Sequence, residues 1–196
     1  MARRLFVAFV ALSACLIGGC SDGESNDPKP SSGTADAPQA VDGDQDSSMG
    51  DKSAAPTLPD GAQEDTLEGA KAFIRHYVDL LNYAANTGNV TSLRAAARGC
   101  DGCRKYEELY ESTYQNGGYM REPGWHASDM FAAVQGDGST GVLVTIQAPR
   151  MRYRLNRNTE EKIGRRDVYK LRFEVARRSD EWVVTFFGLQ TEADDL

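Results

Sequence analysis

The chain has 196 residues, 40% of them hydrophobic, and a formal net charge of −7. The charge is unevenly spread: residues 21–65 carry eleven acidic residues against two lysines, whereas residues 66–196 carry 18 acidic and 18 basic residues. The second region has the length of one ordinary domain, and its neutrality argues against nucleic-acid binding, which needs a basic surface.

The first 19 residues have the pattern of an export signal. Two arginines precede an apolar run at residues 5–17, and Gly18–Gly19 leads directly to Cys20. A basic start, a short apolar run and small residues at the cleavage site are typical of secretory signals. The run is also shorter than the roughly 20 apolar residues that a transmembrane helix needs. We therefore predict a signal peptide over residues 1–19.

Cys20 resembles the cysteine of the bacterial lipoprotein lipobox, where the thiol receives a diacylglyceryl group and the peptide is cut before it. The resemblance predicts a membrane anchor of two or three acyl chains, such as palmitate, on the extracytoplasmic face of the cell membrane. A second pattern ends at Cys15. That alternative would leave Leu16 and Ile17 beside the lipid, whereas the chain turns polar directly after Cys20. We therefore prefer Cys20.

Residues 20–64 are rich in Ser, Gly, Pro and acidic residues and contain no aromatic residue. Low hydrophobicity with high net charge predicts a disordered segment, which self-repulsion and prolines extend. We interpret it as a tether for the domain at residues 65–196, which holds both tryptophans and all eight tyrosines.

The domain begins with helical periodicity and continues with strand periodicity. Apolar positions spaced three and four apart predict a first helix, with Asp65 and Glu68 as a cap and Gly88 as its stop. The predicted helices cover residues 65–86, 91–98 and 104–115, and the predicted strands cover 125–134, 142–155, 169–175 and 182–189, with a polar loop over 156–166.

The fold class that follows is α+β. Each predicted strand alternates apolar and polar residues, which is typical of an antiparallel sheet with one buried face. We expect three N-terminal helices packed on a curved antiparallel sheet of three to five strands, in a cone-like roll.

This order of elements resembles the cystatin-like cone of the nuclear transport factor two superfamily. The segment 72–83, together with Gly99-Cys100-Asp101-Gly102-Cys103, Gly117-Gly118 and Trp125, is similar to an uncharacterised family of actinobacterial lipoproteins. The resemblance implies a fold and a location, and it carries over no catalytic residue. The superfamily includes isomerases, dehydratases, cyclases and non-catalytic partners, so the fold does not determine the function.

Cys100 and Cys103 form the strongest local motif of the domain. Two cysteines of an exported protein usually pair, so we predict a disulfide between the second and third helices. A redox pair is the alternative, because a thiol at a helix N-terminus has a lowered pKa. A closed metal site needs four ligands. His76 and His126 are not spaced in the sequence as metal ligands, so they do not complete a site with Cys100 and Cys103. We predict no metal and no cofactor.

Two functions remain open for a cavity between the first helix and the sheet. We favour a non-catalytic domain that binds a small apolar ligand or a cell-envelope protein. The alternative is an enzyme with isomerase- or dehydratase-like chemistry, for which His76, Asp79 and Asp129 are the acid–base candidates. The predicted pocket residues are Tyr77, Trp125, Tyr153 and Phe173.

The last feature is a basic stretch. Residues 150–178 contain eleven lysines and arginines against four acidic residues. Such a face suits an anionic lipid, a cell-wall polymer, an acidic partner or the chain's own acidic tether, and an ordinary solvated surface is the simplest interpretation. Its predicted members are Arg150, Arg152, Arg154, Lys170 and Arg172.

Overall fold

The computed structural model describes residues 54–121 and 124–190. In chain order the elements are η1 (Asp60–Gln63), α1 (Leu67–Thr87), α2 (Thr91–Ala96), α3 (Asp101–Gln115), β1 (Tyr119–Arg121), β2 (His126–Val134), β3 (Thr140–Ala148), β4 (Arg152–Arg154), β5 (Lys162–Ile163), β6 (Asp167–Arg178) and β7 (Glu181–Leu189). Among these residues no helix is long and apolar enough to cross a membrane. The compact unit Ser47–Leu196 contains every one of these elements and is expected to fold without the residues before it.

The helix ends are set by local hydrogen bonds. At the start of α1 the Thr66 hydroxyl accepts a hydrogen bond from the Gly69 N–H at 2.9 Å, so the cap is Thr66 rather than the predicted Asp65. Helix α3 ends in a Schellman motif. Gly117, with φ +72°, donates to the carbonyl of residue 114, and Gly118 donates to that of residue 113. The chain therefore turns sharply at the Gly117–Gly118 pair.

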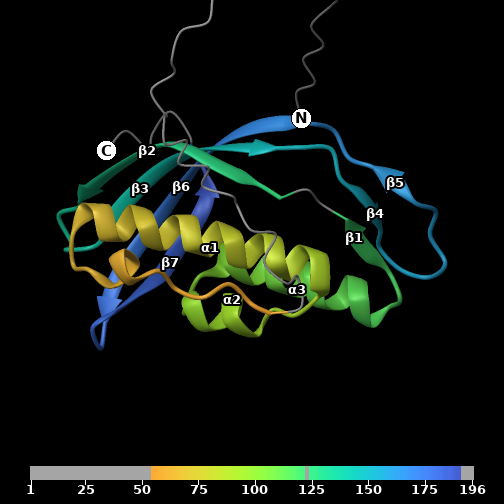
Figure 1. Cartoon of the computed structure of the whole chain (residues 1–196), viewed down its shortest axis with the longest axis horizontal. Coiled ribbons are helices and arrows are strands. Elements are labelled where there is room, and N and C mark those ends of the chain that lie inside the picture. The colour runs from red at the N-terminus through yellow and green to blue at the C-terminus, as the bar shows by residue number, and fades with distance from the viewer. Residues whose placement is uncertain (1–53, 122–123, 191–196) are drawn as a thin grey trace, which may run out of the picture. The chain divides into compact units, whose positions relative to one another are not determined.

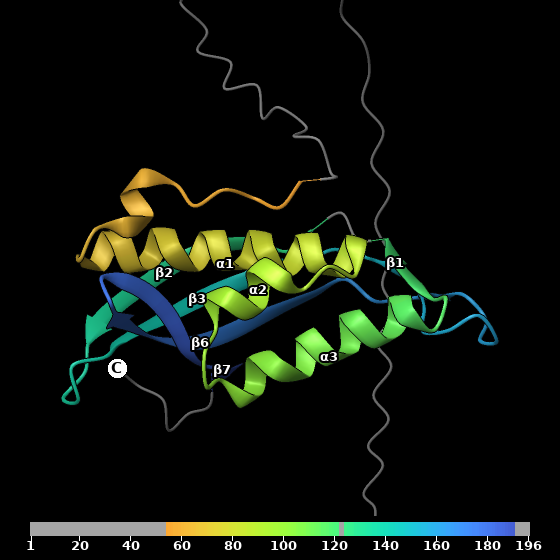
Figure 2. The same cartoon turned by 90° about the horizontal axis from the view of Figure 1, so that it is seen from below.

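The larger sheet has four antiparallel strands in the order β2-β3-β6-β7. Its buried face carries cross-strand pairs such as Val142 opposite Phe173 and Val144 opposite Leu171. Figures 1 and 2 show α1, α2 and α3 on one face of this sheet. The predicted α+β class, with helices on one face of an antiparallel sheet, is confirmed.

The smaller sheet corrects the predicted strand 142–155. Strand β3 ends at Ala148 because Pro149 cannot donate to the ladder, and the chain resumes as β4 in a separate antiparallel sheet, β1-β4-β5. Strand β5 lies inside the predicted polar loop. Figures 1 and 2 show the smaller sheet beyond the C-terminal end of α1.

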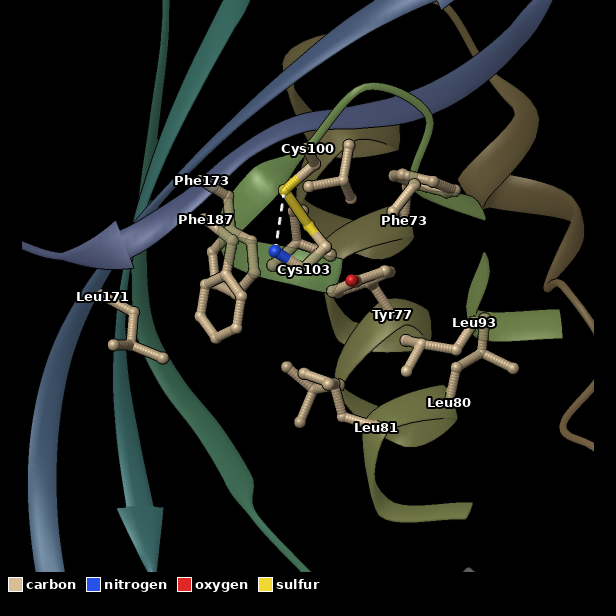
Figure 3. Close-up of a cluster of buried hydrophobic side chains, with 14 of the residues drawn as sticks. Phe73, Tyr77, Leu80, Leu81, Leu93, Cys100, Cys103, Leu171, Phe173 and Phe187 are labelled. Carbon is tan, nitrogen blue, oxygen red and sulfur yellow. Dashed lines mark hydrogen bonds between the residues drawn. A yellow bond between two sulfur atoms is a disulfide. The ribbon is translucent and has the colours of Figure 1, made fainter. Parts of the chain in front are cut away.

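The core lies between α1, the start of α3 and the larger sheet. Figure 3 shows Phe173 and Phe187 directed from the strands toward Tyr77 on α1, with the Cys100–Cys103 disulfide above them. Phe173 stacks on Phe187 at 4.7 Å between ring centroids, and Tyr77 meets Phe173 edge-on at 6.0 Å. These rings fill the space in which the sequence had placed part of a pocket.

The predicted signal peptide, Cys15, Cys20 and the tether up to residue 53 lie outside the described residues. Residues 54–64, which the sequence assigned to the tether, pack on the domain instead. The Trp182 indole N–H donates to the Glu64 carbonyl at 2.9 Å, and Arg177 donates to the Gln63 carbonyl at 3.0 Å. We call residues 54–64 the strap.

Candidate functional site

Two adjoining cavities lie between α3, Trp125 just before β2, the start of β6 and the end of β7, and the smaller one also reaches β1 and β4. The larger has a volume of about 320 Å3 and the smaller about 220 Å3. Both are lined by Tyr106, Trp125 and Tyr169. We call the pair the aromatic groove; its further lining residues include Leu171 and Phe187 in the larger cavity, and Tyr110, Met120, Met151 and Tyr153 in the smaller one.

The rings of the aromatic groove form a connected series that begins in the core. Phe187 contacts Tyr106 at 5.0 Å between ring centroids, and Tyr106 meets Trp125 edge-on at 5.9 Å. Trp125 in turn lies 6.2 Å from Tyr169. Because Phe187 also stacks on the fully buried Phe173, the groove wall is continuous with the rigid core.

Trp125 is held by Asn82 of α1, 43 residues earlier in the chain. The backbone N–H of Trp125 donates to Asn82 Oδ1 at 2.7 Å, and Asn82 Nδ2 donates to the backbone carbonyl of Trp125 at 3.0 Å. Gly124 has φ +110°, and a Cβ there would lie 3.2 Å from Asn82 Nδ2. A side chain at position 124 would therefore crowd the amide that fixes Trp125.

Tyr106 is positioned by the first turn of α3. Gly102 packs so closely on β7 that a Cβ there would lie 2.1 Å from the Phe187 carbonyl oxygen. The Cys103 N–H donates to Cys100 Sγ at 3.1 Å, so the disulfide also caps the helix (Figure 3). The helix thus begins at Asp101 rather than at the predicted residue 104. Cys100 is 6% exposed and Cys103 is 0% exposed, which leaves little access for a redox partner.

The four predicted pocket residues separate into two groups. Trp125 and Tyr153 line the aromatic groove. Tyr77 and Phe173 are 0% exposed and belong to the core, so the structure corrects their assignment to a pocket wall. The Tyr77 hydroxyl has no hydrogen-bond partner among the described residues, and burial, followed by the charge of Glu107, raises the pKa of Tyr77.

The acid–base candidates do not meet in the aromatic groove. Asp79 and Asp129 are exposed, and Asp129 has φ +46° at an irregularity of β2. His76 lies in a different cavity of about 460 Å3, beneath the strap and beside Phe73 and Trp182. Burial lowers the pKa of the His76 imidazole. Within the described residues no group of three His, Cys, Asp or Glu side chains could hold a metal ion.

The predicted basic face is divided between the two sheets. Arg152 and Arg154 lie on β4 of the smaller sheet, and Arg150 is exposed just before it. Lys170 and Arg172 lie on β6 of the larger sheet, where Arg172 pairs with Glu174 at 2.6 Å. The structure therefore corrects the single predicted face to two separate groups.

Three central residues of the aromatic groove are not among the predicted pocket residues: Tyr106, Tyr169 and Phe187. Each lies within a predicted helix or strand (104–115, 169–175 or 182–189), so the pattern marked the correct elements. It could not show where along β6 and β7 the helices stop covering the sheet. That boundary is set by the close approach of Gly102 to β7, which depends on contacts between distant residues.

Comparison with known proteins gives one family and several distant structures. The profile of a family of unknown function, DUF6318, matches residues 51–186. No curated protein matches the chain. The intermembrane space region of the chloroplast protein ARC6 is 14% identical and has a TM-score of 0.50; the match covers 66% of this chain and 99% of that one. At this identity the likeness shows a shared fold alone.

Two further solved structures match more loosely. One, from Xanthomonas campestris, is described as a calcium/calmodulin dependent protein kinase II association domain; it is 12% identical with a TM-score of 0.39, covering 70% of this chain and 95% of that one. The other, from Pseudomonas putida, is described as a polyketide cyclase; it is 13% identical with a TM-score of 0.30, covering 61% and 93%. Neither likeness carries an argument about this chain.

Proposed function

We propose that this chain, which belongs to the DUF6318 family of unknown function, is a membrane-anchored lipoprotein whose domain binds a small apolar or amphipathic ligand in the aromatic groove. The observation that carries the proposal is the partly exposed series Tyr106, Trp125 and Tyr169, which lines both cavities. Aromatic rings left partly uncovered and fixed in place are the usual lining of a small-molecule site.

The aromatic groove is arranged before any ligand arrives. Asn82 fixes the Trp125 backbone with two hydrogen bonds, and Tyr106 stands on a helix whose first turn is closed by a disulfide. A ligand therefore has few side chains to immobilise, which reduces the entropy lost on binding.

The lining supports binding rather than acid–base catalysis. Its charged residues are Lys105 and Arg165, and it includes neither a carboxylate nor an imidazole. The two cations could orient the anionic end of an amphipathic ligand whose apolar part lies on the rings. A dehydratase or isomerase would need a group of suitable pKa within hydrogen-bond reach of its substrate.

The anchor rests on Cys20 and the apolar run before it, as the sequence indicates. The proposed location is the extracytoplasmic face of the cell membrane. Cells fed an alkyne analogue of palmitate would label the wild-type chain and the Cys15→Ser variant but not Cys20→Ser. Absence of label from the wild-type chain would overturn the anchor, and retention of label by Cys20→Ser would overturn its assignment to Cys20.

The aromatic groove is tested with the apolar fluorophore N-phenyl-1-naphthylamine. The chain has two tryptophans, so Trp182→Phe leaves Trp125 as the only indole donor for energy transfer to the probe. We expect probe binding to quench Trp125, and Tyr106→Ala to weaken binding about tenfold, because one aromatic contact and its buried area are lost.

The matched control is Phe131→Ala, which removes a ring that is 56% exposed on β2 and outside the groove. It should leave the affinity for the probe unchanged. Equal weakening by Tyr106→Ala and Phe131→Ala would mean that the probe adheres to exposed apolar surface, and the binding function would be withdrawn.

A further inference from the structure

The smaller sheet carries a basic face that the aromatic groove does not use. Tyr119 is opposite Arg154 and Arg121 is opposite Arg152, so these four residues share one face of the pair β1–β4. Opposite residues of an antiparallel pair project to the same side. We call these four side chains the arginine face. They belong to β1 and β4, two strands of the sheet that Figures 1 and 2 show past the end of α1.

Tyr119 lies between two of the arginines. The Arg121 guanidinium carbon is 4.9 Å from the centroid of the Tyr119 ring, and that of Arg154 is 5.1 Å away. Cation–π contacts of this kind hold the arginines at the surface without neutralising them. One carboxylate, Glu161, is bound here: it accepts hydrogen bonds from Arg152 and from the Tyr119 hydroxyl, which lower the pKa of Glu161.

The surroundings of the arginine face are also basic. Residues 150–166 contain seven lysines and arginines against two glutamates, within a domain whose 18 basic and 18 acidic residues balance overall. A concentration of like charge on one projecting element is unfavourable for the isolated protein and favours an anionic partner.

Exposed aliphatic side chains accompany the charges. Ile163 on β5 pairs with Arg152 and is 67% exposed, and Leu155, one residue after β4, is 41% exposed. The smaller sheet therefore combines arginines, a tyrosine and exposed aliphatic side chains. This combination suits the headgroup region of a bilayer. An acidic protein would match the arginines but not these aliphatic side chains.

We propose that the arginine face binds anionic phospholipid headgroups. The inference builds on the proposed membrane anchor: a lipid at Cys20 would keep the domain within reach of a bilayer, and the arginine face would then orient it. The phosphate groups of the lipid would lie against Arg121 and Arg154, the two arginines that Glu161 does not pair with, and Ile163 would lie at the level of the acyl boundary.

The test uses the compact unit from Ser47 to Leu196, which lacks Cys20, so that failure of the anchor and failure of this inference are distinguishable. It is sedimented with vesicles of phosphatidylcholine alone and with vesicles that also contain phosphatidylglycerol. We expect binding to the anionic vesicles only, reversed by salt. Each arginine near the surface changes partitioning roughly fivefold, so Arg121→Gln/Arg154→Gln should lower it roughly 25-fold.

The matched control is Arg75→Gln/Arg98→Gln, which removes the same charge from exposed positions on α1 and after α2. It should bind like wild type. The proposal is overturned if both double variants lose binding equally, because net charge alone would then explain it. It is also overturned if the unit ignores anionic vesicles but is retained by polyglutamate, which would assign the face to an acidic protein.

Discussion

Asn82 connects α1 to the aromatic groove, and its replacement tests how the groove is held open. Asn82→Ala removes both hydrogen bonds to the Trp125 backbone, at 2.7 Å and 3.0 Å, while leaving a good helix-forming residue in α1. The Trp125 N–H and carbonyl would then have to find water in a partly buried loop. We expect the loop that carries Trp125 to loosen.

The magnitude follows from the two bonds. Each contributes about 1 kcal/mol net, so Asn82→Ala should destabilise the domain by about 2 kcal/mol. For a domain of this size that corresponds to a fall of roughly 6–8 °C in Tm. Asn82→Asp keeps the acceptor for the Trp125 N–H but places a carboxylate beside the Trp125 carbonyl, so it should be no more stable than Asn82→Ala at neutral pH.

Thermal unfolding measures the loss of stability, and fluorescence anisotropy in the Trp182→Phe background measures the mobility of Trp125. The matched control is Asn86→Ala, one turn later on α1, where an exposed amide donates to the Asn82 carbonyl. We expect lower anisotropy and weaker probe binding for Asn82→Ala only. If Asn82→Ala shifts Tm no more than Asn86→Ala does, the two hydrogen bonds do not position Trp125 and the reasoning fails.

Two further predictions concern His76 and Gly102. Burial lowers the pKa of His76 in the folded state, so below about pH 6.5 the unfolded chain binds the additional proton more readily. The stabilising effect of neutral His76 is complete above that pH and is lost as the pH falls. The midpoint urea concentration of unfolding should therefore fall less steeply in acid for His76→Gln than for the wild-type protein. Gly102→Ala places a Cβ 2.1 Å from the Phe187 carbonyl oxygen and should destabilise by about 1–3 kcal/mol in urea unfolding, although alanine favours helices.

Each of these has its own control. The wild-type profile is the reference for His76→Gln, and an unchanged profile for this variant would show that the buried imidazole does not control the loss of stability in acid. Gly61→Ala adds a Cβ that meets nothing within 4 Å and should be tolerated. Equal stability of the Gly102 and Gly61 variants would contradict the close packing of α3 on β7.

Periodicity predicted the helices and the main strands because each of them buries one face. In the predicted strand 169–175, Tyr169, Leu171 and Phe173 occupy alternate positions, yet Tyr169 lines the aromatic groove while Phe173 is fully buried. The difference arises from how far α3 covers β6 and β7. A sequence pattern shows which face is buried but not where along the strand the cover ends.

The smaller sheet could not be predicted for a different reason. Strands β1, β4 and β5 have three, three and two residues, too few to establish a period of two. Their pairing depends on the turn at Gly117–Gly118 and on the break at Pro149, which bring residues 119–121 beside 152–154. Only after this pairing do Arg121 and Arg152 share a face.

The central claim is that the aromatic groove binds an apolar ligand, and a crystal structure of the Ser47–Leu196 unit with N-phenyl-1-naphthylamine tests it most directly. We expect the probe between Tyr106, Trp125 and Tyr169, with the Asn82–Trp125 hydrogen bonds intact. A probe found in the cavity beside His76, or only on the exposed ring of Phe131, would contradict it.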